Sequence, residues 1–177
     1  MTDAPDLPDA PEYSVHSARA AAQHDQLAAW VARFLASPGS DNAVLAEQLC
    51  RELGWWAGPV QLPIDQLNRL AGPASDPVLI PVDEDYWDER VDALDKLAER
   101  GGDPSPVIVA FRNGEFTLED GNHRVEAVRR AGRRVTWAVV GFAQQEERDR
   151  FADEWAHSPR AGQHDSRGKG VEATEHP

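Results

Sequence analysis

The sequence has few of the features that mark secreted or membrane-spanning proteins. It contains a single cysteine, Cys50, which excludes an internal disulfide and favours a reducing compartment. Its first residues are acidic and rich in proline, without the basic start and apolar run of a signal peptide. No apolar stretch approaches the length that crosses a bilayer. These absences predict a soluble, cytoplasmic protein without a membrane partner.

Basic residues are scarce as well. The chain has 18 Lys and Arg against 31 Asp and Glu, a formal net charge of −13. A nucleic-acid binder usually concentrates cations to neutralise phosphates, so this balance argues against nucleic acid as a partner, although one local basic patch remains compatible with it. The excess negative charge is expected mainly to favour solubility. Hydrophobic residues make up 41% of the 177 residues, enough for one packed domain with tails.

The sequence pattern divides the chain into two tails, an arm and a domain. Residues 1–13 are broken by three prolines and residues 158–177 are polar, so both are predicted to be disordered tails. Residues 14–57 are expected to form a helical arm. Within it, apolar residues at helical spacing predict one helix over 17–36, capped by Ser17, and a second over 41–53. Residues 58–157 are expected to form the main domain.

Two features of the arm have both a functional and a structural interpretation. Cys50 lies on the apolar stripe of the second predicted helix, which favours a packed thiol over a nucleophile. Trp55 and Trp56 could stack on bases, but beside an apolar helix they are expected to seal the junction between arm and domain. The structural interpretation is preferred for both.

The main domain is expected to mix short strands with helices. The Asn113-Gly114 pair predicts a two-residue hairpin, because both positions of such a turn need positive φ. Acidic residues at 83–88 are interpreted as a helix cap and a solvated face rather than a metal site. The fold class is therefore predicted to be α+β: a small mixed sheet with packed helices, preceded by a two-helix arm. The expected elements are a strand at 59–62, helices at 65–70 and 83–100, strands at 107–111 and 116–118, a helix at 123–131, a strand at 135–140 and a helix at 144–155.

A polar segment, EDGNHR at residues 119–124, lies between a predicted strand and a predicted helix. At a helix N-terminus the free backbone N–H groups and the helix dipole favour an anion. Gly121 allows a sharp turn and a close approach of the backbone to a ligand. Arg124 can fork onto phosphate oxygens, and His123 can donate a further hydrogen bond. The segment therefore predicts a phosphate-binding turn.

Each of these residues also has a structural alternative that the sequence leaves open. Asp120 could only cap the helix, and Gly121 could serve the turn alone. His123 could be half-buried and satisfied by a carbonyl. Arg124 could form a surface ion pair with a neighbouring glutamate, of little energetic value.

Residues 106–140, PVIVAFRNGEFTLEDGNHRVEAVRRAGRRVTWAVV, resemble the core of the ParB N-terminal/sulfiredoxin superfamily. ParB-type members open a helix with a Gly-x-x-Arg-x-x-Ala box, which is matched at Gly121, Arg124 and Ala127. Sulfiredoxins have a Gly-Cys-His-Arg box, matched at Gly121, His123 and Arg124. Upstream, residues 60–67 and 83–100 resemble the preceding elements of that fold, so the resemblance covers about half of the chain.

The resemblance implies a nucleotide ligand, ATP, ADP or CTP, with Mg²⁺ as a companion ion. In the family the His and Arg of the box contact nucleotide phosphates, so His123 and Arg124 are expected to do so here. Gly121 and Asn122 belong to the same binding turn. Sulfiredoxins also use a basic residue on the preceding helix, for which Arg90 is the best match.

Departures from the family pattern limit the expected function. Asn122 replaces the catalytic cysteine of sulfiredoxin, which excludes sulfinic acid reduction. After Val140 we expect only one helix and a tail, which argues against the helix-turn-helix region of partition-type ParB. Some relatives are phosphotransferases, an activity that needs a base near the phosphate, and Asp120 or Glu119 could serve, with Asp120 as the candidate catalytic residue. The sequence thus predicts a nucleotide-binding protein, with phosphotransferase or nucleotide hydrolase as the catalytic hypothesis. The alternative is a non-catalytic nucleotide-responsive or protein-interaction module that contacts another protein through the arm, whereas the charge disfavours a nuclease.

Overall fold

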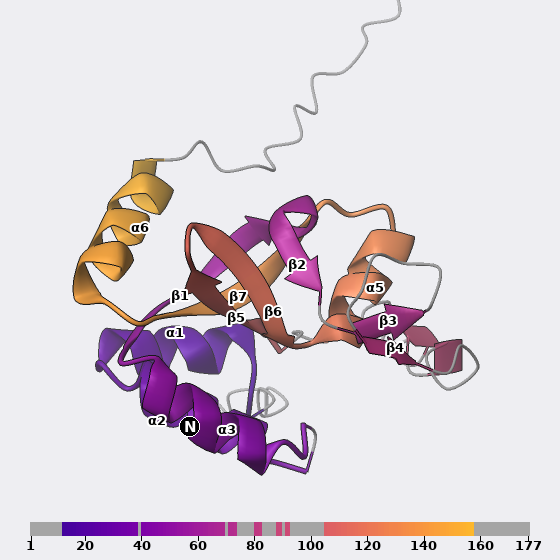
Figure 1. The fold of residues 1–177 in the computed structure, drawn as a ribbon, viewed down its shortest axis with the longest axis horizontal. Coiled ribbons are helices and arrows are strands. Elements are labelled where there is room, and N and C mark those ends of the chain that lie inside the picture. Colours follow the sequence, from indigo (N-terminus) through magenta and orange to yellow (C-terminus); the bar gives the residue numbers. More distant parts are fainter. Residues whose placement is uncertain are drawn as a thin grey trace, which may run out of the picture.

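A computed structural model describes residues 12–38, 40–69, 71–73, 80–82, 88–89, 91–92 and 105–157. In this part of the chain five strands form one mixed sheet that lies between two groups of helices (Figure 1). The predicted α+β fold class is therefore confirmed. The strand order is β1 (Trp55–Pro63), β7 (Val135–Phe142), β5 (Val107–Arg112), β6 (Glu115–Asp120) and β2 (Leu67–Arg69), and a separate parallel pair consists of β3 (Ala71–Pro73) and β4 (Ile80–Val82).

The sheet combines antiparallel and parallel pairs around the central strand β5. β5 runs antiparallel to β6 and parallel to β7. β1 is antiparallel to β7, and β2 is parallel to β6. Asn113 and Gly114 join β5 to β6 with φ values of 55° and 84°, so the predicted hairpin turn is confirmed.

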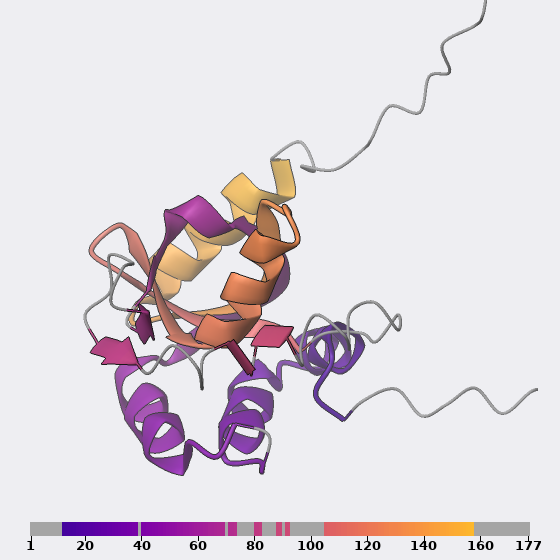
Figure 2. The ribbon, with the colours of Figure 1, turned by 90° about the vertical axis from the view of Figure 1, so that its right-hand side faces the viewer.

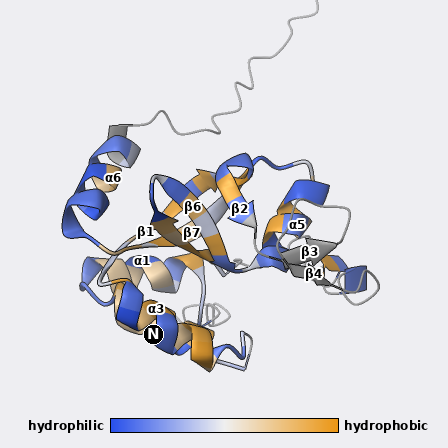
Figure 3. Ribbon diagram, viewed as in Figure 1, coloured by the Kyte–Doolittle hydropathy of each residue, from blue (hydrophilic) through white to orange (hydrophobic). Residues whose placement is uncertain are grey.

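The two faces of the sheet are covered by different helices (Figure 2). Along β5 the side chains alternate, as they do in any strand. Ile108 and Ala110 pack with the arm, whereas Val107 and Val109 pack on the other face with α5 (Asn122–Arg130) and α6 (Gln145–His157). Phe151 anchors α6 to this second face, while the rest of α6 is mostly hydrophilic (Figure 3). A strand buried on both sides explains the unbroken apolar run in the sequence.

The arm contains three helices: α1 (Val15–Gln23), α2 (Leu27–Leu35) and α3 (Ala43–Glu52). The prediction of one helix over 17–36 was wrong, because the chain breaks between α1 and α2, where Asp25 has a φ of 54°. A short polar side chain tolerates this left-handed conformation better than most. The first helix also starts earlier than expected: Ser14 is the N-cap, and its Oγ accepts a hydrogen bond from the Ser17 N–H at 3.1 Å.

Three smaller expectations also differ from the structure. Cys50 is exposed rather than packed, so the prediction for its thiol was wrong. The helix expected over 65–70 is a single 3₁₀ turn, Ile64–Gln66, followed by strand β2. The strand expected at 59–62 begins earlier, at Trp55.

Several expectations lie outside the described residues. These are both terminal tails beyond residues 12 and 157, Arg90, and most of the helix expected over 83–100, of which residues 88–89 and 91–92 are helical. Among the residues that the structure describes, no helix combines the length and the apolar character needed to cross a membrane.

Candidate functional site

The segment that the sequence predicts as a phosphate-binding turn joins β6 to α5. Asp120 is the last residue of β6, and Gly121 is the N-cap residue of α5 with φ 106° and ψ 23°. No side chain of the N-cap residue caps the helix, because glycine has none. Asp120 therefore does not occupy the cap position, and the first turn of α5 presents its backbone N–H groups without a cap from Gly121.

Gly121 is required by the packing of the chain itself. A Cβ at this position would lie 2.6 Å from Cγ1 of Val107 and 2.9 Å from Nη2 of Arg124. Both distances are shorter than any real Cβ contact, so another residue would have to displace β5 or the arginine. Close packing against Val107 and Arg124 within the chain is thus one reason for a glycine at position 121.

Arg124 lies between the β6–α5 turn and the arm. Its Nη2 donates to Oδ2 of Asp120 at 2.6 Å, and its guanidinium carbon is 5.3 Å from the ring centroid of Phe34 on α2. The Arg124 side chain is 20% exposed and that of Asp120 is 19% exposed. Oδ1 of Asp120 accepts a hydrogen bond from Oγ of Ser40 at 3.4 Å. The partner of Arg124 is therefore Asp120, not the neighbouring glutamate that was one open alternative.

The arm thus contributes residues to the site that sequence reasoning missed. Phe34 and Ser40 precede the turn by about eighty residues, and nothing in local spacing connects them with it. The apolar stripe of α2 correctly predicts that Phe34 is buried, but not that its ring faces an arginine.

In the turn, Oδ1 of Asn122 and Nε of Arg124 are buried polar atoms without a hydrogen-bond partner among the described residues. One is an acceptor and the other a donor. A buried polar group without a partner costs about 1–3 kcal/mol, so such atoms usually mark a ligand, an ion or a bound water. His123, the next residue of the first turn, is partly buried.

Glu119 is engaged away from the turn. Its carboxylate, with a side chain only 7% exposed, forms an ion pair with Nη1 of Arg112. Nη2 of Arg112 reaches Oε2 of Glu52 on α3 at 2.7 Å. Burial alone would lower the pKa of Arg112, but its hydrogen bonds to Glu119 and Glu52 raise that pKa above its usual range. Arg112 thus joins Glu119 in the sheet to Glu52 in the arm.

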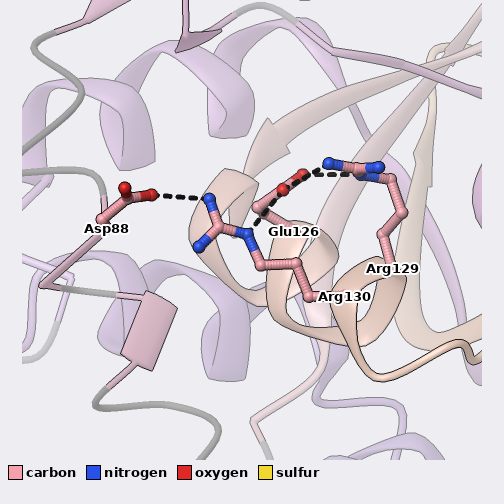
Figure 4. Close-up of polar contacts among 4 residues, drawn as sticks. All are labelled: Asp88, Glu126, Arg129 and Arg130. Atoms are coloured by element: carbon pink, nitrogen blue, oxygen red, sulfur yellow. Dashed lines mark hydrogen bonds and ion pairs between the residues drawn. The ribbon is translucent and has the colours of Figure 1, made fainter.

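A second network fixes the other half of α5 (Figure 4). The Glu126 side chain is 1% exposed and accepts hydrogen bonds from Nε and Nη2 of Arg129 at 2.9 and 2.6 Å, and from Nε of Arg130 at 2.9 Å. Nη2 of Arg130 also reaches Oδ1 of Asp88 at 2.6 Å. The hydrogen bonds to Asp88 and Glu126 raise the pKa of Arg130. The sequence signal for this network is the spacing of three and four residues along one helix.

No group of three or more His, Cys, Asp or Glu side chains in the described part of the chain could hold a metal ion. Two cavities, of about 550 and 280 Å³, are present elsewhere, and neither is lined by residues 121–124. The structure therefore brings together Asp120, Gly121, Asn122, His123 and Arg124, while Arg90 lies outside the described residues.

No family model and no curated protein matches this sequence. Among solved structures, a free serine kinase in complex with AMP is 17% identical with a TM-score of 0.35, over 46% of this chain and 30% of that chain. Sulfiredoxin from Arabidopsis thaliana is 22% identical with a TM-score of 0.32, over 52% and 92%. The C-terminally truncated chromosome-partitioning protein ParB from Caulobacter crescentus, complexed with CTP-gamma-S, is 18% identical with a TM-score of 0.35, over 58% and 56%.

The chain spans less than a third of the free serine kinase and about half of the ParB structure. With every TM-score below 0.5, the likeness carries no conclusion about activity or ligand.

Proposed function

We propose that this protein binds the phosphate groups of a nucleotide at the N-terminus of α5. The observation that carries the proposal is the uncapped start of this helix, with Arg124 in its first turn. An anion there would accept hydrogen bonds from the first-turn N–H groups and from the guanidinium, including its buried Nε. The field of the helix dipole adds to this attraction.

A nucleotide offers groups that match the polar atoms of the turn. Oδ1 of Asn122 is a buried acceptor, and it requires a hydrogen-bond donor. A ribose hydroxyl or the amino group of a base is such a donor. The family resemblance at Gly121, His123 and Arg124 supports the same ligand class, ATP, ADP or CTP. Because the described residues contain no metal cluster, Mg²⁺ would arrive bound to the phosphates.

Binding at this turn requires a rearrangement of one ion pair. Arg124 now donates to Asp120, and a phosphate that takes its guanidinium would bring a second negative charge next to that carboxylate. In the catalytic hypothesis, Asp120 released from Arg124 acts as general base and the protein is a phosphotransferase or nucleotide hydrolase.

The second candidate is a non-catalytic, nucleotide-responsive or protein-interaction module. It is favoured by the contacts of the turn with the arm, because Asp120 accepts from Ser40 and Arg124 covers Phe34. A phosphate that moves Arg124 would therefore alter how the arm is held. Nucleotide turnover separates the two candidates.

The proposal is tested by thermal unfolding with ADP, ATP and CTP, with and without Mg²⁺. A ligand that binds only the native state raises the apparent stability by mass action, so at least one nucleotide should raise the Tm. Arg124→Lys keeps the positive charge but loses the forked donors of the guanidinium, so it should reduce the rise in Tm. Arg133 is an exposed arginine outside the turn. Arg133→Ala removes a charge but should leave the nucleotide-induced rise in Tm unchanged. No rise with any nucleotide at millimolar concentration would refute the proposal.

A further inference from the structure

β1 is an edge strand, with β7 as its neighbour on one side. Edge strands present backbone N–H and C=O groups to other chains, and proteins usually protect them. The second half of β1 is protected: Pro59 and Pro63 lack an N–H, and the carbonyl of Gln61 accepts a hydrogen bond from Nε1 of Trp155 at 3.0 Å. In the described structure, no hydrogen bond from outside the sheet reaches the backbone of residues 54–58.

The register shows which backbone groups of this open half point outward. Gln61 lies opposite Trp137, and Trp56 lies opposite Gly141. Trp137 and Gly141 are four residues apart on β7, so their backbone groups point to the same side. The carbonyl of Gln61 points away from β7, toward Trp155. The backbone N–H and C=O of Trp56 therefore also point away from β7. The β-bulge between Ala57 and Val60 lies in β1, so it does not change the four-residue spacing of Trp137 and Gly141 on β7.

The cavity of about 550 Å³ lies along this open edge. Its lining residues come from the α1–α2 turn and α2 and from α6. Figure 1 shows these helices on either side of the start of β1. Small side chains, among them Ala28 and Ala152, leave the edge accessible. Trp55 contributes an apolar wall and is 38% exposed, which is unusual for so large a hydrophobic side chain in this structure. The cavity is in the size range of binding pockets for small ligands or short peptide segments.

The charges in the cavity favour a basic ligand. Nε of Arg148 lies 3.2 Å from Oδ1 of Asp149, so its charge is matched by its neighbour, and its guanidinium carbon lies 5.9 Å from the ring centroid of Trp55. Asp25 also lines the cavity and has no ion pair among the described residues. The net charge of −13 attracts cations at longer range.

We propose that the open half of β1 binds an extended, basic segment of a partner protein. The segment adds a strand next to residues 54–58, with hydrogen bonds to the backbone of Trp56. A Lys or Arg of the segment faces Asp25, and an apolar side chain packs on the part of Trp55 that Arg148 does not cover. This interaction surface is separate from the turn at residues 121–124 and does not depend on nucleotide binding.

The test is selection of a phage-displayed library of random eight-residue peptides on the full chain. Ala28→Trp fills the cavity from an exposed helical position, and Ala29→Trp is its matched control, since Ala29 is exposed on the same helix but does not line the cavity. Enriched peptides should carry Lys or Arg and bind Ala28→Trp at least tenfold more weakly than wild type and Ala29→Trp. If Ala28→Trp does not fold, Ala152→Trp fills the cavity from α6.

Strand addition is distinguished from simple charge attraction by N-methylation of an enriched peptide. Methylating alternate residues removes the N–H donors of one edge only, so one of the two alternating patterns should weaken binding at least tenfold and the other should not. Asp25→Asn should also weaken binding, and Asn tolerates the positive φ of this position. The proposal is overturned if no peptide binds wild type more tightly than Ala28→Trp. It is also overturned if peptides with the two methylation patterns bind equally well.

Discussion

Gly121 and its neighbours determine the geometry of the candidate site residue by residue. The positive φ of Gly121 turns the chain from β6 into α5 and places the helix start against Val107. The same turn brings Asp120 and Arg124 together at 2.6 Å. The sequence correctly indicated the glycine and the helix start, because both are local signals. It did not indicate that Phe34 packs against Arg124 or that Ser40 donates to Asp120, since these two residues come from a distant helix and loop.

Gly121→Ala should destabilise the protein more than Gly132→Ala does. Both glycines have positive φ, which costs about 1–2 kcal/mol for a residue with a Cβ. At Gly121 the Cβ also meets Val107, which adds about 1–3 kcal/mol of overpacking, whereas nothing lies within 4 Å at Gly132. Urea unfolding measures both differences, and equal values would show that the contact with Val107 is easily relieved.

Asp120→Asn should strengthen nucleotide binding, because it removes a negative charge next to the bound phosphates. We expect a gain on the order of tenfold in affinity, about 1.4 kcal/mol, by calorimetry. If Asp120 is a general base, the same variant loses nucleotide consumption with free amino acids and small alcohols as acceptors. Turnover that survives in Asp120→Asn would remove Asp120 as the base. Binding without turnover in the wild type would favour the non-catalytic module.

At the scale of elements, the sequence predicted those whose signals are local. The β5–β6 hairpin, α5 and β7 were predicted within a few residues, because turn glycines and β-branched runs mark them. The first helix of the arm was not, and the break at Asp25 was missed although the polar run QHDQ at residues 23–26 interrupts the apolar residues there. Cys50 was placed on the buried stripe of its helix, but α3 buries Ala46 and Leu49 instead. Which face a short helix buries depends on its tertiary neighbours, and periodicity alone does not determine it.

The attachment of α3 to the sheet through Glu52 and Arg112 should depend on pH. The hydrogen bonds from Arg112 and Gln48 hold the pKa of the Glu52 carboxyl below its usual value of 4.5. A lowered pKa in the folded state stabilises the protein above the unfolded value, and this stabilisation is lost as the pH falls through the folded value. Glu52→Gln should therefore be slightly less stable than wild type at pH 7, by under about 1 kcal/mol for so exposed a pair.

The difference between Glu52→Gln and wild type should shrink as the pH is lowered below 4.5. Chemical unfolding at several pH values measures it. Glu146→Gln, an exposed glutamate on α6, serves as the control and should show no such trend. A difference that grows toward low pH would contradict the assignment.

At the scale of the whole molecule, one sheet contributes side chains to two hydrophobic cores, one on each face. Ile108 and Ala110 of β5 pack with the arm, and Val107 and Val109 pack with α5 and α6. The arm therefore covers a sheet face that would otherwise expose buried apolar residues to water. The chain has a formal net charge of −13, and at the candidate phosphate site the N-terminus of α5 and Arg124 locally oppose it.

Because both cores share β5, the arm and the sheet should unfold together. Leu35→Ala removes a fully buried side chain from the arm and should destabilise the whole protein by about 2–5 kcal/mol. Unfolding curves recorded by tryptophan fluorescence and by far-UV circular dichroism should coincide, in the variant and in the wild type. Two separate transitions would show that the arm is an independent unit.

The most direct test of nucleotide binding at the start of α5 is a titration of the ¹⁵N-labelled protein with ATP and Mg²⁺, followed by the backbone amide resonances. Hydrogen bonds from the first-turn N–H groups to phosphate should shift the amides of Asn122, His123 and Arg124 in a saturable way. The amide resonances of residues 54–58 at the β1 edge should not shift. The account would be contradicted if millimolar nucleotide left the amides of these three residues unmoved, or if the saturable shifts centred on another part of the protein.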